Sequence, residues 1–408
     1  MRRHGPALAL TLALTLVGGR FAAADEYHYQ GNPVGARAAA MGGAFTGLAN
    51  DNAAAFYNPA GMVLGTGTEL SLSTSVYGVA RDDIAGSQGA QPPTFLAFPS
   101  TFVLVKTPFW VKQDDPAPRH RYGLAVLVTD FTKIARQGTT ADSTTLLKTS
   151  DATTYAGLAY AYRWRERLSF GASAFLVSRA LTRFEQTSRT GSGSDVELDR
   201  REIEGSHLGA QIFAGALYRP TERWSFGLCV RTPSFDLGGS LKLSQFSKRP
   251  GSPLDEQSST EGSFTSQLPL TVILGGAWHA HERLLLSADL SVHAPTGTYT
   301  ALATPQMTET VDKGAVVNGA IGLEILLGRH VPLRTGFYTD RSARAGARGT
   351  SLADLDPDYV VFTGSIGYET DRTAIVAGGA LETGSVDTPS FRLERQEIRW
   401  WVAASYRL

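Results

Sequence analysis

The chain has little of what marks most functional classes. Its 408 residues contain one cysteine, Cys229, so no internal disulfide can form. The 38 basic and 38 acidic residues balance, which argues against nucleic acid as a partner, because nucleic-acid-binding surfaces are strongly basic. Charged residues make up only 19% of the chain, against roughly 25% in soluble domains. Beyond Asp25 no apolar run is long enough for a membrane-spanning helix, which needs about 20 residues.

Signatures of catalysis and of resident cofactors are also missing. Neither the phosphate loop G-x-x-x-x-G-K-[ST] nor the nucleophile elbow G-x-S-x-G occurs in the chain. His279 and His281 are spaced as two ligands on one strand face could be, but no carboxylate or third histidine accompanies them, so they indicate a solvated turn. We therefore expect no enzyme activity, no cofactor and no metal.

The first 24 residues have the pattern of a cleaved export signal. Arg2 and Arg3 form a basic start, residues 7–17 form an apolar core, and three alanines at 22–24 form a small-residue cleavage site. Mature protein would then begin at Asp25. If an exported chain without an apolar helix enters a membrane, it must do so as a closed β-barrel, the other structure that pairs every backbone polar group in lipid.

Period-two alternation runs through the rest of the chain and predicts strands. The clearest case is residues 284–293, where Leu286, Leu290 and Val292 fall on one face while Ser287 and Asp289 fall on the other. One such face suits lipid and the other suits water. Turn signals divide the chain into fourteen such segments, near residues 68–82, 93–109, 121–136, 152–165, 168–186, 206–219, 223–243, 263–280, 283–300, 315–327, 331–341, 359–369, 373–383 and 395–408.

The connections between these segments alternate in length. Tight polar turns are expected at residues 163–167, 219–223, 279–283, 328–330 and 368–372, and long loops at 137–151, 186–206, 246–262, 299–314, 342–358 and 383–394. Short turns on one rim and long loops on the other are typical of an outer-membrane barrel. Aromatic residues near predicted strand ends suit an interfacial belt, although they also occur in a soluble periplasmic β-protein, the alternative fold; they are Trp164, Trp224, Trp278, Tyr338 and Tyr368.

Residues 35–62, GARAAAMGGAFTGLANDNAAAFYNPAGM, are small and apolar and precede the first predicted strand. Asn32 and Pro33 predict the start of a helix from Arg37 to Ala44, and Asp51 can cap a second helical turn. Asn58, Pro59 and Ala60 stop that turn, since the residue before a proline is pushed out of the helical region. We predict a compact lumenal plug in which the Asn58 side chain bonds the barrel wall. The simpler interpretation of these three residues is a helix stop alone.

With its plug and strands, the chain resembles the FadL/TodX family of outer-membrane channels for long-chain fatty acids and hydrocarbons. The resemblance covers the whole mature chain. It rests on five short sequence matches, each of low specificity alone but more specific together because of their order and spacing. They are Gly42-Gly43-Ala44-Phe45, Asn58-Pro59-Ala60, residues 268–278 with 286–289, residues 333–342, and Leu355-Asp356-Pro357-Asp358-Tyr359.

The resemblance implies an all-β fold, a 14-stranded antiparallel transmembrane β-barrel with an N-terminal helical plug, or hatch, in its lumen. The divisions would be a signal peptide at 1–24, the plug at 25–66 and the barrel at 67–408. It also implies passive uptake of hydrophobic molecules that are captured at the outer face and released sideways through the wall. The protein would contact outer-membrane lipid and depend on the barrel assembly machinery.

Candidate site residues follow from the plug and from the resemblance. Apolar plug residues could line a ligand pocket or simply fill the core; they are Phe45, Leu48, Phe56, Tyr57 and Met62. The resemblance implies that the mature N-terminus, residues 25–30, and a basic residue belong to the pocket. Strand arginines that could face the lumen are Arg163, Arg231, Arg334 and Arg407. The lateral exit would lie at Thr129, Asp130 and Phe131, a stretch without the glycine or proline that would favour a kink.

One alternative function remains open at this stage. Residues 35–44 also resemble the plug segment of PorV-like proteins, which share the fold and serve as secretion or assembly partners. Uptake of a labelled fatty acid or alkane by cells with and without the gene separates the two functions.

Overall fold

The structure is a computed structural model that describes residues 26–31, 33–65, 67–85, 93–98, 101–106, 118–139, 142–190, 196–249, 255–345, 355–388 and 392–407. The predicted signal peptide at 1–24 and the expected cap Asn32 lie outside these ranges. Within them, no helix is both long enough and apolar enough to cross a membrane.

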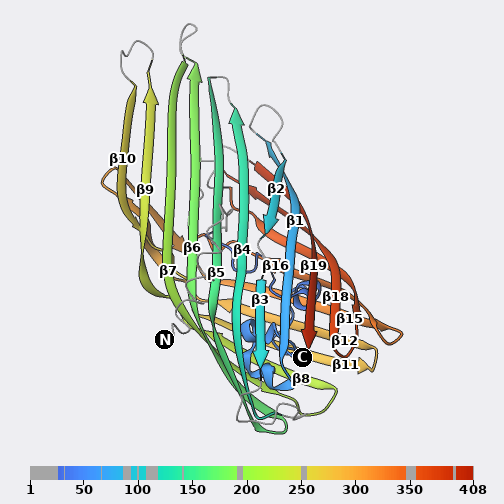
Figure 1. Cartoon of the computed structure of the whole chain (residues 1–408). Coiled ribbons are helices and arrows are strands. Elements are labelled where there is room, and N and C mark those ends of the chain that lie inside the picture. Colours follow the sequence, from blue (N-terminus) through green and yellow to red (C-terminus); the bar gives the residue numbers. More distant parts are fainter. Residues whose placement is uncertain are drawn as a thin grey trace, which may run out of the picture.

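The described residues form nineteen strands in one antiparallel barrel (Figure 1). The first strand, β1 (Glu69–Ala85), pairs with the last, β19 (Arg392–Arg407), which closes the sheet on itself. The strands occupy fourteen positions around the wall, because five positions are each filled by two consecutive strands. The predicted all-β, 14-stranded antiparallel barrel is confirmed.

The doubled positions are β2 (Thr94–Phe98) with β3 (Thr101–Lys106), β8 (Trp224–Arg231) with β9 (Phe235–Lys248), β10 (Glu256–Phe264) with β11 (Thr271–His281), β12 (Leu284–His293) with β13 (Gly297–Thr304), and β14 (Met307–Lys313) with β15 (Val316–Leu327). The single positions are β1, β4 (His120–Thr139), β5 (Ser143–Arg165), β6 (Leu168–Thr190), β7 (Val196–Tyr218), β16 (Val331–Asp340), β17 (Asp358–Glu369), β18 (Thr373–Asp387) and β19.

Three of the doubled positions break where a proline falls. Pro233 lies between β8 and β9, Pro269 between β10 and β11, and Pro295 between β12 and β13. Proline has no backbone N–H to give to a β-ladder, so a strand in the middle of a sheet ends beside it. The sequence predicts one uninterrupted strand at each of these positions, and the structure corrects this to two.

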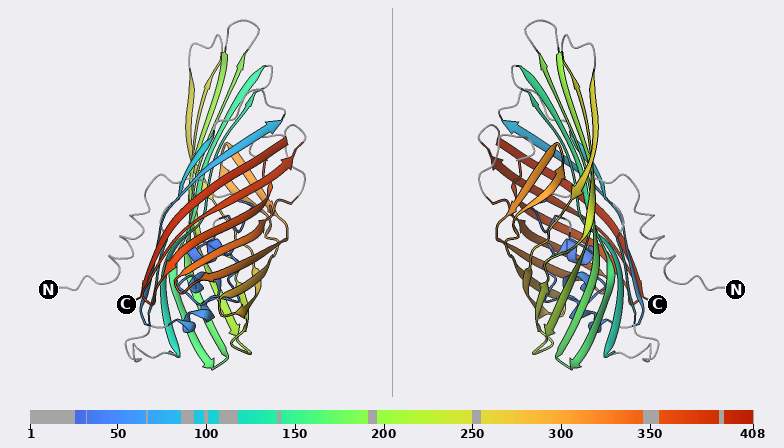
Figure 2. Two further views of the ribbon diagram at one scale, coloured as in Figure 1. Left: turned by 90° about the vertical axis from the view of Figure 1, so that its right-hand side faces the viewer. Right: turned by 90° about the vertical axis from the view of Figure 1, so that its left-hand side faces the viewer.

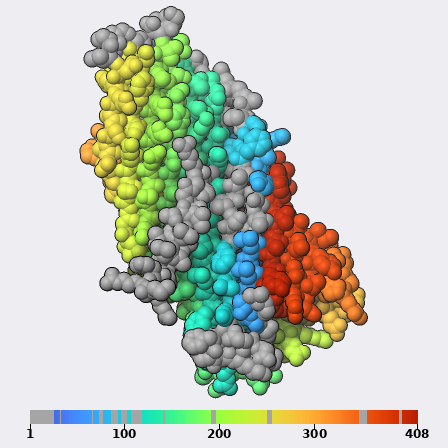
Figure 3. Space-filling view, in the orientation of Figure 1, coloured from blue at the N-terminus to red at the C-terminus, as the bar shows by residue number. Residues whose placement is uncertain are grey.

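Most of the predicted long loops are also wrong, because the strands continue through them. β6 and β7 stay paired from Leu168–Tyr218 up to Thr190–Val196, so residues 186–206 are largely strand. Residues 137–151, 246–262 and 383–394 are largely strand as well, and 299–314 forms the β13–β14 hairpin. The outward side chains of these segments are mostly polar, although inward ones such as Ile203, Leu302 and Leu393 are buried and apolar. They therefore lack the apolar outer face that marks the lower wall. The barrel is therefore taller at β5, β6, β7, β9 and β10 than elsewhere (Figures 1 and 3).

The predicted alternation is present where the wall carries apolar residues. In β12, Leu286, Leu290 and Val292 are exposed on the outer surface, whereas Ser287 and Ser291 are buried inside. The five expected tight turns join β5–β6, β7–β8, β11–β12, β15–β16 and β17–β18. All of them lie at the end of the barrel where β19 finishes, which we call the short-turn end (Figure 2).

Four of the five predicted belt aromatics lie exposed near that end: Trp164, Trp224, Trp278 and Tyr368. Trp224 and Trp278 face each other across β8 and β11, with ring centroids 5.4 Å apart. Tyr338 is an exception to the prediction. It is 1% exposed and packs inside the barrel against Ala44 and Val361, because the alternation of β16 places Leu333 on the outer surface and Tyr338 on the inner one.

Residues 26–31 and 33–65, which we call the N-terminal segment, lie inside the barrel, with the helices in its short-turn half (Figure 2). The segment contains α2 (Ala36–Ala40), α3 (Ala54–Tyr57) and the 3-10 helix η1 (Pro59–Leu64). α2 ends sooner than predicted, because Gly42 and Gly43 take positive φ angles of 65° and 76° that favour glycine and end the helix. Asp51 accepts a 2.8 Å hydrogen bond from the Ala53 amide just before α3.

Candidate functional site

Asn58 fixes the N-terminal segment to the wall. Its side-chain amide donates to the carbonyl of Ala216 in β7 and to the carbonyl of Thr46, both at 3.0 Å. Its side-chain oxygen accepts from the Ala60 amide at 3.2 Å. Asn58 is fully buried, so each of these bonds satisfies a group that water cannot reach.

Wall glycines let the N-terminal segment approach closely. Three cross-strand glycine pairs face it: Gly171 with Gly215, Gly227 with Gly275, and Gly322 with Gly336. A Cβ on Gly171 would overlap the Pro59–Ala60 peptide, and one on Gly215 would overlap the Asn58 side chain. The 43 glycines of the chain are thus partly explained by backbone contact across the lumen.

The predicted pocket residues divide into two groups. Phe45, Leu48 and Met62 are at most 3% exposed and belong to the packed core between segment and wall. Phe56 and Tyr57 also reach a central cavity of about 60 Å³. Phe45, Leu48 and Met62 therefore fill the core. Of the five predicted residues, only Phe56 and Tyr57 lie where a ligand could contact them.

The central cavity adjoins a second one of about 70 Å³, and the two share Tyr29, Thr129, Arg231 and His293 in their linings. Phe56 lies at the edge of an aromatic cluster with Tyr155, Phe175 and Phe213, whose ring centroids are 5.1 to 6.5 Å apart. Sequence reasoning missed Tyr29, Tyr155 and His293. Residue 29 falls within the N-terminal stretch that the resemblance implies, but nothing in the chain marks the other two.

Arg231 lies between the segment and the wall. Its guanidinium carbon is 4.4 Å from the ring centroid of Phe56 and 4.5 Å from that of Phe213, and it donates to the Phe56 carbonyl at 3.3 Å. Within the described residues it forms no ion pair.

The other three strand arginines also face inward: Arg163 donates to the Val63 carbonyl, Arg334 binds Glu324 and Glu369, and Arg407 binds Glu69.

The start of the segment is held by charges at the second cavity. The Glu26 carboxylate forms ion pairs with Arg179 and with Lys313, the latter at 2.7 Å, and accepts from the Tyr299 hydroxyl. Arg179 also binds Asp151. The Glu26 pairs leave no signal in the sequence, because Glu26 is separated from its partners by 153 residues or more.

The predicted exit residues coincide with an irregularity in β4. Val128 pairs with Thr154 and Asp130 with Thr153, so Thr129 is an extra residue, a β-bulge. The bulge reverses the alternation: Arg121 and Leu127 face inward before it, and Arg136 does so after it. A bulge bends a strand without glycine or proline, so no residue type in this stretch predicts it. Asp130 lies beside Gly31, and Phe131 is 5% exposed.

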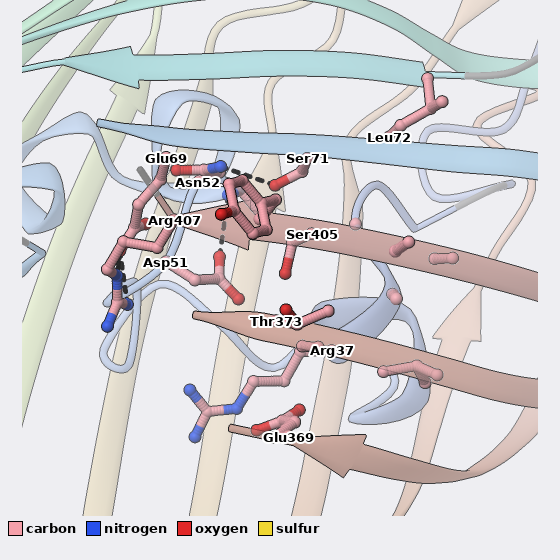
Figure 4. Close-up of a pocket in the computed structure, with 18 of the residues that line it drawn as sticks. Arg37, Asp51, Asn52, Glu69, Ser71, Leu72, Glu369, Thr373, Ser405 and Arg407 are labelled. Carbon is pink, nitrogen blue, oxygen red and sulfur yellow. Dashed lines mark hydrogen bonds and ion pairs between the residues drawn. The ribbon is translucent and has the colours of Figure 1, made fainter. Parts of the chain in front are cut away.

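A larger cavity of about 310 Å³ lies at the short-turn end, between the segment and strands β1, β18 and β19 (Figure 4). Charged groups surround it. Arg37 binds Glu324 at 2.7 Å and Asn50 at 2.8 Å, and Glu69 binds Arg407. Burial raises the pKa of Asp51 to about 6, although the nearby Arg37 guanidinium opposes the rise.

Comparisons with known proteins define the class of fold. No protein-family model matches the chain, and no curated protein does. Solved structures do: a FadL homologue from Pseudomonas aeruginosa is 16% identical with a TM-score of 0.68, over 94% of this chain and 100% of that one. The toluene transporter TodX from Pseudomonas putida is 17% identical with a TM-score of 0.67, with the same coverage. TbuX, a toluene transporter from Ralstonia pickettii, is 15% identical with a TM-score of 0.64, over 93% and 99%.

At these identities the likeness establishes the fold. The chain has the barrel fold of the FadL homologue and of the toluene transporters, over nearly its whole length and theirs.

Proposed function

We propose that the chain is an outer-membrane channel through which hydrophobic molecules, long-chain fatty acids or hydrocarbons, enter passively. They are captured at the outer face and leave sideways through the wall at Thr129–Phe131, while residues 25–66 act as a hatch. The observation that carries the lateral route is the position of Thr129, the extra residue of the β4 bulge, in the lining of both central cavities.

The outer surface supports placement in a membrane. Along β7 the outward side chains from Tyr218 through Ile212 to Leu208 are apolar, and Ser206 and Glu204 follow. This apolar stretch of about eleven residues matches the length of a tilted transmembrane strand. The exposed tryptophans near the short turns suit one membrane interface, where their rings contact lipid headgroups.

The short-turn end supports lateral exit over exit straight through the lumen. A hydrophobic molecule that continued along the barrel axis would meet the ion pairs of Arg37 and Arg407 and the half-buried Asp51 (Figure 4). Apolar groups gain nothing by displacing such polar contacts. The bulge instead offers a route from an aromatic-lined cavity to lipid.

The solved structures of similar fold support a channel, since they include toluene transporters. They also support the absence of catalysis. Contact with outer-membrane lipid follows from the proposed placement, and dependence on the barrel assembly machinery stays a prediction.

Uptake tests the proposal directly. Cells with and without the gene are given radiolabelled oleate and radiolabelled toluene, and initial uptake rates are compared. We expect faster uptake of at least one compound when the protein is present. If the gene leaves both rates unchanged but its loss stops surface delivery of other proteins, the chain is a secretion partner and the channel proposal is wrong.

A further inference from the structure

The two central cavities are small and share part of their lining. They measure about 60 and 70 Å³ and share Tyr29, Thr129, Arg231 and His293. An engineered cavity of about 150 Å³ in another protein binds benzene. The space available between segment and wall is therefore of the order of a single aromatic ring rather than an extended acyl chain.

One side of this space is aromatic. Phe56 and Tyr57 line the first cavity and Tyr155 lines the second, and Phe56 meets Tyr155 edge-on with 5.7 Å between ring centroids. Edge-to-face contacts of this kind accept a further ring at similar spacing.

The other side carries polar atoms that make no hydrogen bond to any residue the structure describes. They are the Tyr29 hydroxyl, Arg231 Nε and His293 Nε2, all three buried. The Tyr29 and His293 rings stack with centroids 4.5 Å apart, and His293 Nδ1 lies 3.0 Å from the Thr271 hydroxyl. The three residues that carry these groups line both cavities.

The charges around the two cavities balance. Three cations, Arg179, Arg231 and Lys313, meet three carboxylates, Glu26, Asp130 and Asp289. A ligand with its own charge would upset this balance in a buried site, where an unpaired charge is costly. A neutral ligand with an oxygen acceptor satisfies the free donors at no such cost.

Resting on the proposed channel function, we propose that the central cavities bind a neutral, oxygenated single-ring aromatic molecule of the phenol class. Its ring packs against Phe56 and Tyr57, and its oxygen accepts hydrogen bonds from the Tyr29, Arg231 and His293 side. The cavity therefore selects phenols over unsubstituted hydrocarbons such as toluene and over anions such as benzoate.

Binding to the purified full-length mature protein in amphipol tests the inference. Equilibrium dialysis with radiolabelled phenol, toluene and benzoate, corrected for uptake by amphipol alone, gives three dissociation constants. We expect phenol to bind most tightly. Tyr29→Phe removes one hydroxyl and should weaken phenol binding about three- to tenfold, the range of one hydrogen bond, while toluene binding stays within about twofold.

Tyr338→Phe is the matched control. It removes another buried tyrosine hydroxyl, from a residue that lines neither cavity, and should change no dissociation constant. Toluene binding as tightly as phenol, benzoate binding more tightly than phenol, or Tyr29→Phe leaving phenol unaffected would each overturn the inference. Liposome uptake of the same compounds, measured in parallel, separates the two proposals: uptake without phenol preference refutes only this one, and no uptake refutes the channel.

Discussion

Gly171 of β6 and Gly215 of β7 are direct cross-strand partners, and both face the Asn58–Ala60 turn of the N-terminal segment. Neither position has room for even one added carbon. We expect Gly171→Ala to displace the segment at a cost of about 1 to 3 kcal/mol, as overpacking in a core does. The displaced segment should admit ions, so planar-bilayer conductance should rise.

Gly319→Ala is the control for that experiment. Gly319 also lies in a wall strand, but an added Cβ there would meet nothing within 4 Å. Equal conductance of the two variants would show that close packing at Gly171 does not hold the segment in place.

The Asn58 side chain supports a second prediction. Asn58→Ala leaves the carbonyls of Thr46 and Ala216 without their donor and should cost about 1 to 3 kcal/mol for the buried groups left unpaired. Faster hydrogen exchange of the Ala60 amide, measured by mass spectrometry of peptides that cover η1, checks this.

Asn58→Asp distinguishes the two halves of the contact. It keeps an oxygen for the Ala60 amide but loses the donor to both carbonyls. If the Ala60 amide exchanges as slowly in the Asn58→Asp variant as in the unaltered protein, the hydrogen bonds to the two carbonyls contribute nothing to holding the segment.

Deleting Thr129 tests the lateral exit. Without its extra residue, β4 pairs regularly with β5, because Thr154 and Thr153 are already consecutive. We expect a folded barrel with sharply reduced uptake of hydrophobic molecules into proteoliposomes. Deleting Ala280, at the irregular pairing of β11 near the short turns, should leave uptake unchanged. Normal uptake without Thr129 would place the exit elsewhere.

The raised pKa of Asp51 predicts that the stability of the packed N-terminal segment depends on pH. Its pKa is raised in the folded protein to about 6 from 3.8, so between these values the folded state binds more protons than the unfolded state. Its contribution to stability therefore falls as the pH rises from about 4 to about 6. Limited proteolysis within residues 50–57 should become faster over that interval.

Asp51→Asn should remove this pH dependence while its amide oxygen still accepts from the Ala53 amide. The charged groups that act on Asp51 are Arg37, Glu69 and Arg334, and the arginines stay protonated throughout this interval. Persistence of the dependence in Asp51→Asn would show that Asp51 is not its source.

The sequence predicts the lower barrel well, because an apolar outer face and a polar inner face give each strand there a clear alternation, as in Leu286 against Ser287. It fails where that contrast ends. The upper parts of β6 and β7 are mostly polar on the outer face and look like loops, although 23 continuous pairs join the two strands. Asn58 could be singled out because Asn-Pro stops a helix. Tyr29 and His293 could not, because only closure of the barrel brings residues 264 positions apart into contact.

The breaks at Pro233, Pro269 and Pro295 divide the wall into two levels. Above them β9, β10 and β13 pair with one another, and below them β8, β11 and β12 do so. A residue inserted in the upper level shifts no pairing in the lower one, where a slip of one residue would turn inward side chains to the outer surface. The end of the barrel away from the short turns can thus change in length and composition during evolution while the register of the apolar wall stays fixed.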